Sequence, residues 1–147
     1  MKKFQVLFMT VLFSTPSLTV AECSKEVVSS ELSRQGYSYE FLRTDDDGDN
    51  FFRLRKDGSS FSLKVETDGD VSLSKFYQNS GFTNDDTARV MESIKYLQVY
   101  VDSDGDVAMQ YHVAQWGESR CNFDMSSNIR MFMQLINTAE RRLQDES

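Results

Sequence analysis

Apolar and polar residues alternate with a period of two on both sides of segment 103–105. Such alternation predicts β-strands with one buried face. The apolar positions are Leu97, Val99 and Val101 before the turn and Val107, Met109, Tyr111 and Val113 after it. A two-residue turn would mix the two faces, whereas a three-residue loop with a left-handed Gly105 keeps them in agreement. We therefore predict a hairpin that pairs Val101 with Val107, Val99 with Met109 and Leu97 with Tyr111.

The first half of the chain shows the same alternation, interrupted by Asp-Gly dipeptides that favour tight turns. Strands are predicted at 37–42 and 50–56, and two more should follow the turns at 57–58 and 67–69. A two-residue turn pairs Leu54 with Phe61, and a three-residue loop pairs Val65 with Val71. These four strands should form an antiparallel meander. Its outward, solvated positions are expected to include Arg53, Arg55, Ser62, Lys64, Ser72 and Ser74.

Three other segments repeat apolar residues every three or four positions, which predicts helices. Ser24 is expected to cap the first helix, and Gly36 to end it. Asn84 should cap the second helix, and Ser126 or Ser127 the third. The apolar stripes are Val27, Val28 and Leu32; Val90, Met91 and Ile94; and Ile129, Phe132, Met133, Ile136, Ala139 and Leu143. The order helix, four strands, helix, two strands, helix predicts an α+β fold, with helices covering one face of an antiparallel sheet.

The N-terminal segment 1–21 has the layout of a secretory signal peptide. Two lysines precede a short apolar run at 4–13, and the small residues Thr19 and Ala21 stand before the expected cut. The run is too short for a comfortable membrane span. A buried N-terminal helix is one alternative; a lipid anchor on Cys23 is another, disfavoured by the bulky Glu22 before it. We expect residues 22–147 to form a single exported domain, periplasmic or secreted.

Cleavage would remove two lysines and no acid, so the net charge of the chain would change from −7 to −9. A strongly acidic domain argues against nucleic acid and anionic membrane surfaces as partners.

Cys23 and Cys121 both remain after the expected cleavage. In an oxidising compartment, two cysteines are most simply joined as a disulfide, and two separate inert thiols are the alternative. A bridge closing so long a loop could add roughly 4–5 kcal/mol to the stability of the domain. Neither cysteine belongs to a CxxC motif, which argues against thiol-redox catalysis.

The sequence offers little catalytic chemistry. The Asp-rich turns resemble fragments of calcium loops, but the first ligand positions of an EF-hand would fall on Arg43, Lys64 and Tyr100. Asp-Gly is also what a tight hairpin requires. His112 is the only histidine, and the chain has neither a G-x-S-x-G motif nor a glycine-rich phosphate loop. We predict no catalytic residues, no metal site and no cofactor.

The predicted registers direct four residues away from the helices: Phe51, Tyr100, His112 and Trp116. Aromatic residues on an exposed sheet can anchor a partner, although scattered apolar exposure or cover by a loop is the favoured explanation. Met131 and Leu135 flank the stripe of the last helix. They could form the seam of a homodimer or the margin of a wide core face.

The chain resembles the YbjN-type family, described as sensory transduction regulators with a type III secretion chaperone-like fold. The resemblance is carried by Gly36-Tyr37, Asp47-Gly48, 61–63, 94–107 and 128–132; the chain has Ser93-Ile94 where family members often have Asn-Trp. The family has no established catalytic residues. The resemblance implies a non-enzymatic domain that binds a protein or peptide, with a chaperone-like or regulatory role. The alternatives are a periplasmic hydrolase whose site is assembled only in space, and an acidic cation-binding module.

Overall fold

The computed structural model describes residues 23–78, 80–114 and 125–146. The elements are α1 (Lys25–Arg34), β1 (Ser38–Thr44), β2 (Asn50–Lys56), β3 (Ser59–Val65), β4 (Val71–Tyr77), α2 (Asn84–Ser93), β5 (Gln98–Val101), β6 (Val107–Val113) and α3 (Met125–Glu146). The predicted α+β class and the predicted order of elements are confirmed.

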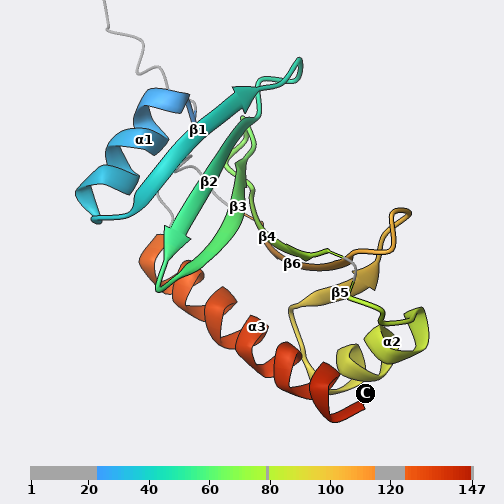
Figure 1. The fold of residues 1–147 in the computed structure, drawn as a ribbon. Helices are drawn as coiled ribbons and strands as arrows, with labels where there is room; N and C mark the ends of the chain where they lie inside the picture. Colours follow the sequence, from blue (N-terminus) through green and yellow to red (C-terminus); the bar gives the residue numbers. More distant parts are fainter. Residues whose placement is uncertain (1–22, 79, 115–124, 147) are drawn as a thin grey trace, which may run out of the picture.

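The strands form one antiparallel sheet in the order β1-β2-β3-β4-β6-β5, so β6 lies between β4 and β5, and β1 and β5 form the edges. The predicted registers are confirmed for three hairpins: Leu54 pairs with Phe61, Val65 with Val71, and Val101 with Val107. Val99 also pairs with Met109. The register stops short of Leu97, because β5 begins at Gln98. Figure 1 shows the sheet twisting strongly between β1–β3 and β4–β6.

Three hairpins share one turn geometry. In the β5–β6 turn the Gly105 amide donates to the Asp102 carbonyl at 3.1 Å, and the Asp102 amide donates to the Asp106 carbonyl at 2.9 Å. Gly105 has φ +82°, which is the left-handed conformation predicted for it. Segments 45–49 and 66–70 repeat the same pair of backbone bonds. The acidic turns therefore close hairpins, as the spacing of Asp-Gly predicted.

The helix caps agree only in part with the predictions. Ser24 caps α1, and Gly36 follows its C-cap with φ +75°. The prediction of Asn84 as the second cap is wrong by one residue. Thr83 is the cap, because its side chain and that of Asp86 bond each other's backbone amides in a capping box. The third cap is also wrong, since α3 already begins at Met125, before both serines proposed for it.

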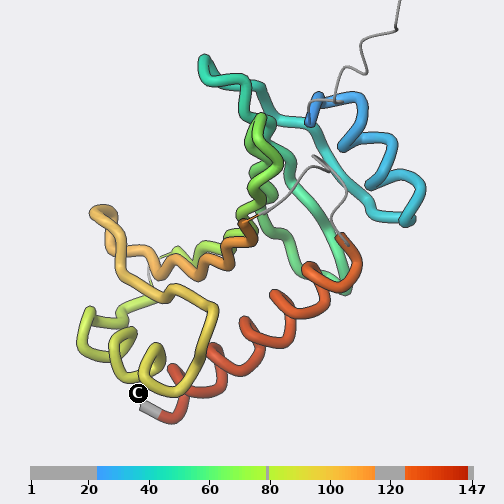
Figure 2. Tube along the Cα trace, turned by 180° about the vertical axis from the view of Figure 1, so that it is seen from behind, coloured from blue at the N-terminus to red at the C-terminus, as the bar shows by residue number. Residues whose placement is uncertain are grey.

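One core joins all three helices to the inner face of the sheet. Figures 1 and 2 show α1 beside β1, α3 running below the sheet, and α2 near β5. The predicted stripe of α3 is buried apart from the half-buried Met133, whereas Val27 and Met91 are exposed, contrary to prediction. Within the described ranges, no helix is both long and apolar enough to cross a membrane.

Candidate functional site on the outer face of the sheet

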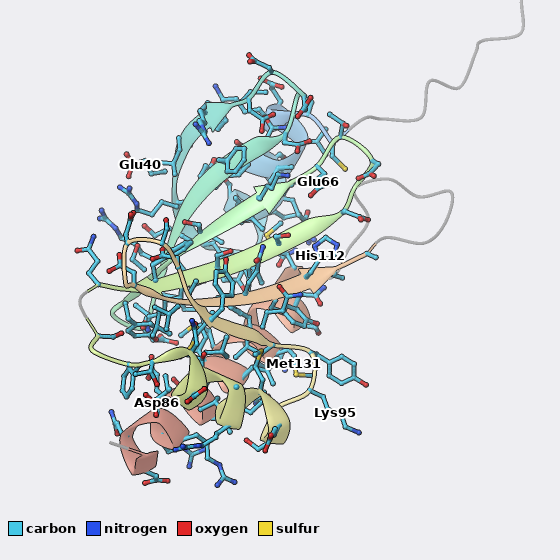
Figure 3. The ribbon with its side chains drawn as sticks, turned by 90° about the vertical axis from the view of Figure 1, so that its right-hand side faces the viewer. Glu40, Glu66, Asp86, Lys95, His112 and Met131 are labelled. Carbon is cyan, nitrogen blue, oxygen red and sulfur yellow. The ribbon has the colours of Figure 1, made fainter. Side chains whose placement is uncertain are left out.

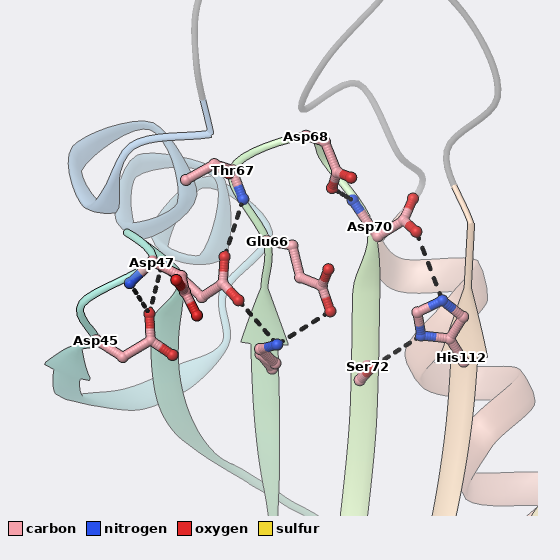
Figure 4. Close-up of polar contacts among 10 residues, drawn as sticks. Asp45, Asp47, Glu66, Thr67, Asp68, Asp70, Ser72 and His112 are labelled. Atoms are coloured by element: carbon pink, nitrogen blue, oxygen red, sulfur yellow. Dashed lines mark hydrogen bonds and ion pairs between the residues drawn. The ribbon is translucent and has the colours of Figure 1, made fainter.

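The register places four side chains in one row across the outer face of the sheet, which we call the polar row. Phe51 on β2 pairs with Lys64 on β3, Lys64 with Ser72 on β4, and Ser72 with His112 on β6. The row lies beside the β1–β2 and β3–β4 turns, so acidic side chains border it (Figure 4). In Figure 3, Glu66 and His112 mark this end of the outer face.

Lys64 forms the electrostatic centre of the polar row. Its ammonium lies 2.8 Å from an Asp49 carboxylate oxygen and 3.0 Å from Glu66 Oε1. The hydrogen bond to Asp49 raises the pKa of Lys64 well above its ordinary value, with Glu66 adding to the effect and partial burial opposing it. Asp49 also accepts a hydrogen bond from the Thr67 amide at 3.2 Å. Lys64 therefore stays charged and joins the two acidic turns.

Phe51 is less available to a partner than its outward position predicted. Its ring is half-buried, and the Arg43 guanidinium lies 4.8 Å from the ring centroid. The Lys64 ammonium lies 5.9 Å from the same centroid. Cations placed over an aromatic face are attracted to it and shield it from other contacts. Phe51 is thus a platform for basic side chains rather than a bare apolar anchor.

The structure brings Ser72 and His112 together across 40 residues of sequence. Ser72 Oγ lies 2.9 Å from His112 Nδ1, and His112 Nε2 lies 3.6 Å from Asp70 Oδ2. The prediction that Ser72 faces solvent is wrong, because it is buried between two longer side chains, Lys64 and His112, on the neighbouring strands. The direction of the hydrogen bond between Ser72 and His112 depends on the tautomer: with the ring proton on Nε2, Nδ1 accepts from the Ser72 hydroxyl and Nε2 faces the Asp70 carboxylate.

This serine, histidine and aspartate have the residue types of a hydrolytic triad, but the Ser72 amide is not positioned to assist acyl transfer. Acyl transfer needs backbone amides aimed at the oxyanion that develops on the substrate. Ser72 sits in a central strand paired on both sides, with Lys64 and with His112. The antiparallel ladder uses the amide of such a residue. The amide of Ser72 therefore cannot act as an oxyanion donor.

The acidic turns use their carboxylates mainly within the turns. Asp102 Oδ1 accepts from the amides of Asp104 and Asp106, both at 3.0 Å. Asp45 does the same with two amides of its own turn, at 3.2 and 2.9 Å. The carboxylates of Glu66, Asp68 and Asp70 lie within 4.8 Å of one another, close enough to share a cation. All three are already engaged, because Glu66 binds the Lys64 ammonium, Asp68 accepts from the Asp70 amide at 3.1 Å, and Asp70 lies beside His112.

A second row crosses the other end of the outer face. Tyr100 pairs with Ala108, and Ala108 pairs with Phe76. Phe76 is 52% exposed and Tyr100 40% exposed, while the small Ala108 between them is buried. The row is an apolar strip, in contrast to the polar row at the opposite end.

A groove of about 700 Å³ adjoins this strip where β3 and β4 separate. The two strands pair only where 62–65 faces 71–74, so the first residues of β3 are apart from the last residues of β4. We call this hollow the outer groove. It is lined by Arg53, Ser60, Phe61, Ser62, Ser74, Lys75, Phe76, Tyr77 and Gln78.

The predicted partner surface is therefore divided between the two rows. Phe51 and His112 belong to the polar row and Tyr100 to the apolar strip, while Trp116 lies outside the described residues. Phe76 was not among the predicted partner residues, although the period of two that places Ser72 and Ser74 on the outer face also places Phe76 there. Lys75, which lies between Ser74 and Phe76 in the sequence, faces the inner side of the sheet. Its ammonium forms an ion pair with Glu140 Oε1 at 3.0 Å.

The other predicted residues lie away from the outer face. Cys23 is buried, and its carbonyl accepts a hydrogen bond from Asn50 Nδ2 at 3.0 Å. Cys121 lies outside the described residues, so the bridge stays a prediction. Met131 is exposed on α3, whereas Leu135 is half-buried and packs against the core. Leu135 is thus part of the core margin, and Met131 alone remains available as a homodimer contact.

No protein-family model matches this chain, and no curated protein matches it significantly. The resemblance to the YbjN-type family stays a prediction made from the motifs of the sequence.

Proposed function

We propose that this protein is an exported, non-enzymatic domain that binds an extended segment of a protein partner in the outer groove. The proposal extends the YbjN-type resemblance, with its chaperone-like or regulatory role, to a particular surface. The observation that carries it is the outer groove itself, where a largely exposed Phe76 lies beside hydroxyl groups from two separating strands.

The lining of the outer groove suits a polypeptide. Exposed aromatic side chains are common anchors of binding interfaces, and Phe76 and Tyr100 offer two of them along one strip. A peptide backbone also needs hydrogen-bond partners wherever it leaves water. The groove provides the hydroxyls of Ser60, Ser62 and Ser74, together with the side-chain amide of Gln78.

The charge of the outer groove favours a neutral or acidic segment. Its two charged lining residues are Arg53 and Lys75, and both are basic. Lys75 is held by Glu140, and Arg53 is paired with Glu40 at 3.2 Å on an exposed part of the sheet. Exposed pairs contribute little energy and exchange readily. Arg53 is therefore available to a carboxylate of the partner.

Photo-crosslinking tests the site directly. A photoreactive phenylalanine analogue replaces Phe76 in the exported chain, and the same analogue replaces Leu42 as a control. Leu42 is also exposed, at 41%, but it lies on β1, away from the outer groove. We expect one partner to be attached at position 76 and not at position 42. Equal adducts at the two positions, or none at 76, would contradict the proposal.

The partner identified in this way permits an affinity measurement. Phe76→Ser should weaken binding by about thirtyfold, the loss of roughly 2 kcal/mol typical of a central aromatic anchor. Leu42→Ser should leave binding within about twofold, since a peripheral residue contributes little. If the attached protein is a second copy of the chain, size-exclusion chromatography will show a dimer that Phe76→Ser converts to monomer.

A hydrolase is the second candidate, favoured by the contact between Ser72 and His112. Its test is the hydrolysis of activated esters and short peptides by the purified chain. We expect Ser72→Ala to leave any measured rate unchanged, because the Ser72 amide is used by the sheet ladder and cannot stabilise an oxyanion. A rate that falls by about 10³-fold or more in Ser72→Ala would establish the hydrolase instead.

A further inference from the structure

A second hollow, separate from the outer groove, lies where three distant parts of the chain meet. It has a volume of about 450 Å³, within the roughly 300–1,000 Å³ range of small-molecule sites. Figures 1 and 2 agree in placing the start of α3 beside the β2–β3 turn and the link from α1 to β1. We call it the basic hollow. Its lining residues are Gln35, Gly36, Tyr37, Ser38, Arg55, Lys56, Asp57, Ser126 and Arg130.

The charge of the basic hollow is opposite to that of the protein. Arg55, Lys56 and Arg130 line it, against the single acid Asp57, in a chain of net charge −7. Within the described residues, neither arginine forms an ion pair, and both side chains are exposed. Three cations gathered in one concavity raise the local concentration of anions.

Tyr37 organises the floor of the basic hollow. Its hydroxyl donates to Ser126 Oγ at 3.4 Å, and Ser126 Oγ donates to Gln35 Oε1 at 2.7 Å. The Lys56 ammonium lies 5.1 Å from the centroid of the Tyr37 ring. Arg130 follows Ser126 by four residues on α3, so both occupy the same face of that helix. Lys56 from β2 therefore lies over the Tyr37 ring, and Arg55 and Arg130 line the same hollow.

We propose that the basic hollow binds a phosphate group, in the form of a soluble phosphate ester. Guanidinium groups present fixed forks of donors that match the oxygens of a phosphate, and the lysine ammonium adds a compact charge. The hydroxyl of Ser38 supplies a further donor, whereas that of Ser126 already donates to Gln35. The first turn of α3 faces the same space, and the N-terminal end of a helix favours negative charge. The remaining volume accommodates the organic part of the ester against the Tyr37 ring.

Titration of the folded chain with inorganic phosphate and with glycerol phosphate, followed by amide NMR shifts, tests the proposal. We expect saturable shifts confined to residues around the basic hollow. Arg55→Gln and Arg130→Gln should each weaken binding by about tenfold or more, because each removes charge-assisted hydrogen bonds to the anion. Arg142→Gln is the matched control, since it removes the same charge from the same helix outside the hollow.

The variants also separate specific binding from general attraction. Arg130→Lys keeps the charge but loses the fork, so its affinity should fall between those of wild type and Arg130→Gln. Equal weakening in Arg130→Gln and Arg142→Gln would overturn the proposal, as would shifts that do not saturate. Circular dichroism melts of all four variants confirm that each remains folded.

Vesicles distinguish the two sources of a phosphate group. We expect no binding to vesicles of phosphatidylcholine, with or without phosphatidylglycerol, because the acidic protein is repelled by anionic surfaces. Vesicle binding that Arg130→Gln abolishes and Arg142→Gln retains would assign the hollow to lipid headgroups and overturn the soluble ester. These results are independent of Phe76, so they do not depend on the outer groove.

Discussion

Replacement of Lys64 by methionine tests whether the polar row stabilises the fold. The side chain of Lys64 is 32% exposed and that of its partner Asp49 only 10% exposed. Lys64→Met would leave Asp49 largely desolvated with one remaining hydrogen bond, from the Thr67 amide. Exposed pairs contribute about 0–1 kcal/mol, and breaking a fully buried pair costs about 3–5 kcal/mol. For this half-buried pair we expect a loss of about 1–3 kcal/mol in the free energy of unfolding.

The assay is urea unfolding followed by circular dichroism, arranged as a double-mutant cycle of Lys64→Met and Asp49→Asn. A matched cycle of Arg53→Met and Glu40→Gln measures an exposed pair on the same sheet, whose side chains are 47% and 56% exposed. We expect a coupling energy of about 1–3 kcal/mol for the first pair and below about 1 kcal/mol for the second. Equal coupling energies in the two cycles would refute the argument from burial.

The pH dependence of this stabilisation follows from the raised pKa of Lys64. A group whose pKa is higher in the folded than in the unfolded state binds its proton more tightly when folded, so its stabilisation is complete below the unfolded pKa. The unfolded pKa of lysine is about 10.4. The contribution of Lys64 should therefore be constant from pH 6 to 9 and decline only as the pH rises above about 10. A decline already at neutral pH would contradict the assignment.

Three further predictions follow from local features. Thr83→Ala should destabilise the domain by about 1 kcal/mol by removing the α2 cap, whereas Thr83→Ser should be near neutral; equal losses would contradict the capping role. Mass spectrometry of the exported protein should show a first residue of Glu22, after a cut following Ala21; retention of segment 1–21 would disprove the signal peptide. A disulfide between Cys23 and Cys121 should block alkylation of both cysteines unless a reductant is added, as measured by intact mass. Cys23→Ser should lower the free energy of unfolding by up to roughly 4–5 kcal/mol. Two alkylated cysteines without reductant would show free thiols instead.

The hairpin registers were determined by the sequence, because each depends on neighbouring residues. Asp-Gly restricts the turn to a few geometries, and the period of two then leaves one register with matching faces. This reasoning holds for Val101 with Val107 and for Leu54 with Phe61. Local reasoning was less exact at the helix starts, where Thr83 and Asn84 are both good caps and only the bond to Asp86 decides between them.

The pairing of β4 with β6 was decided only by the tertiary structure, and so were the contacts between residues that are far apart in the sequence. Alternation tells which face a residue occupies but not which strand lies beside it. Ser72 and His112 meet across 40 residues, and the basic hollow joins the start of β1 and the end of β2 to a helix that begins at Met125. Such contacts form when the whole core closes, because burial of the inner face fixes the strand order and the outer side chains follow from it.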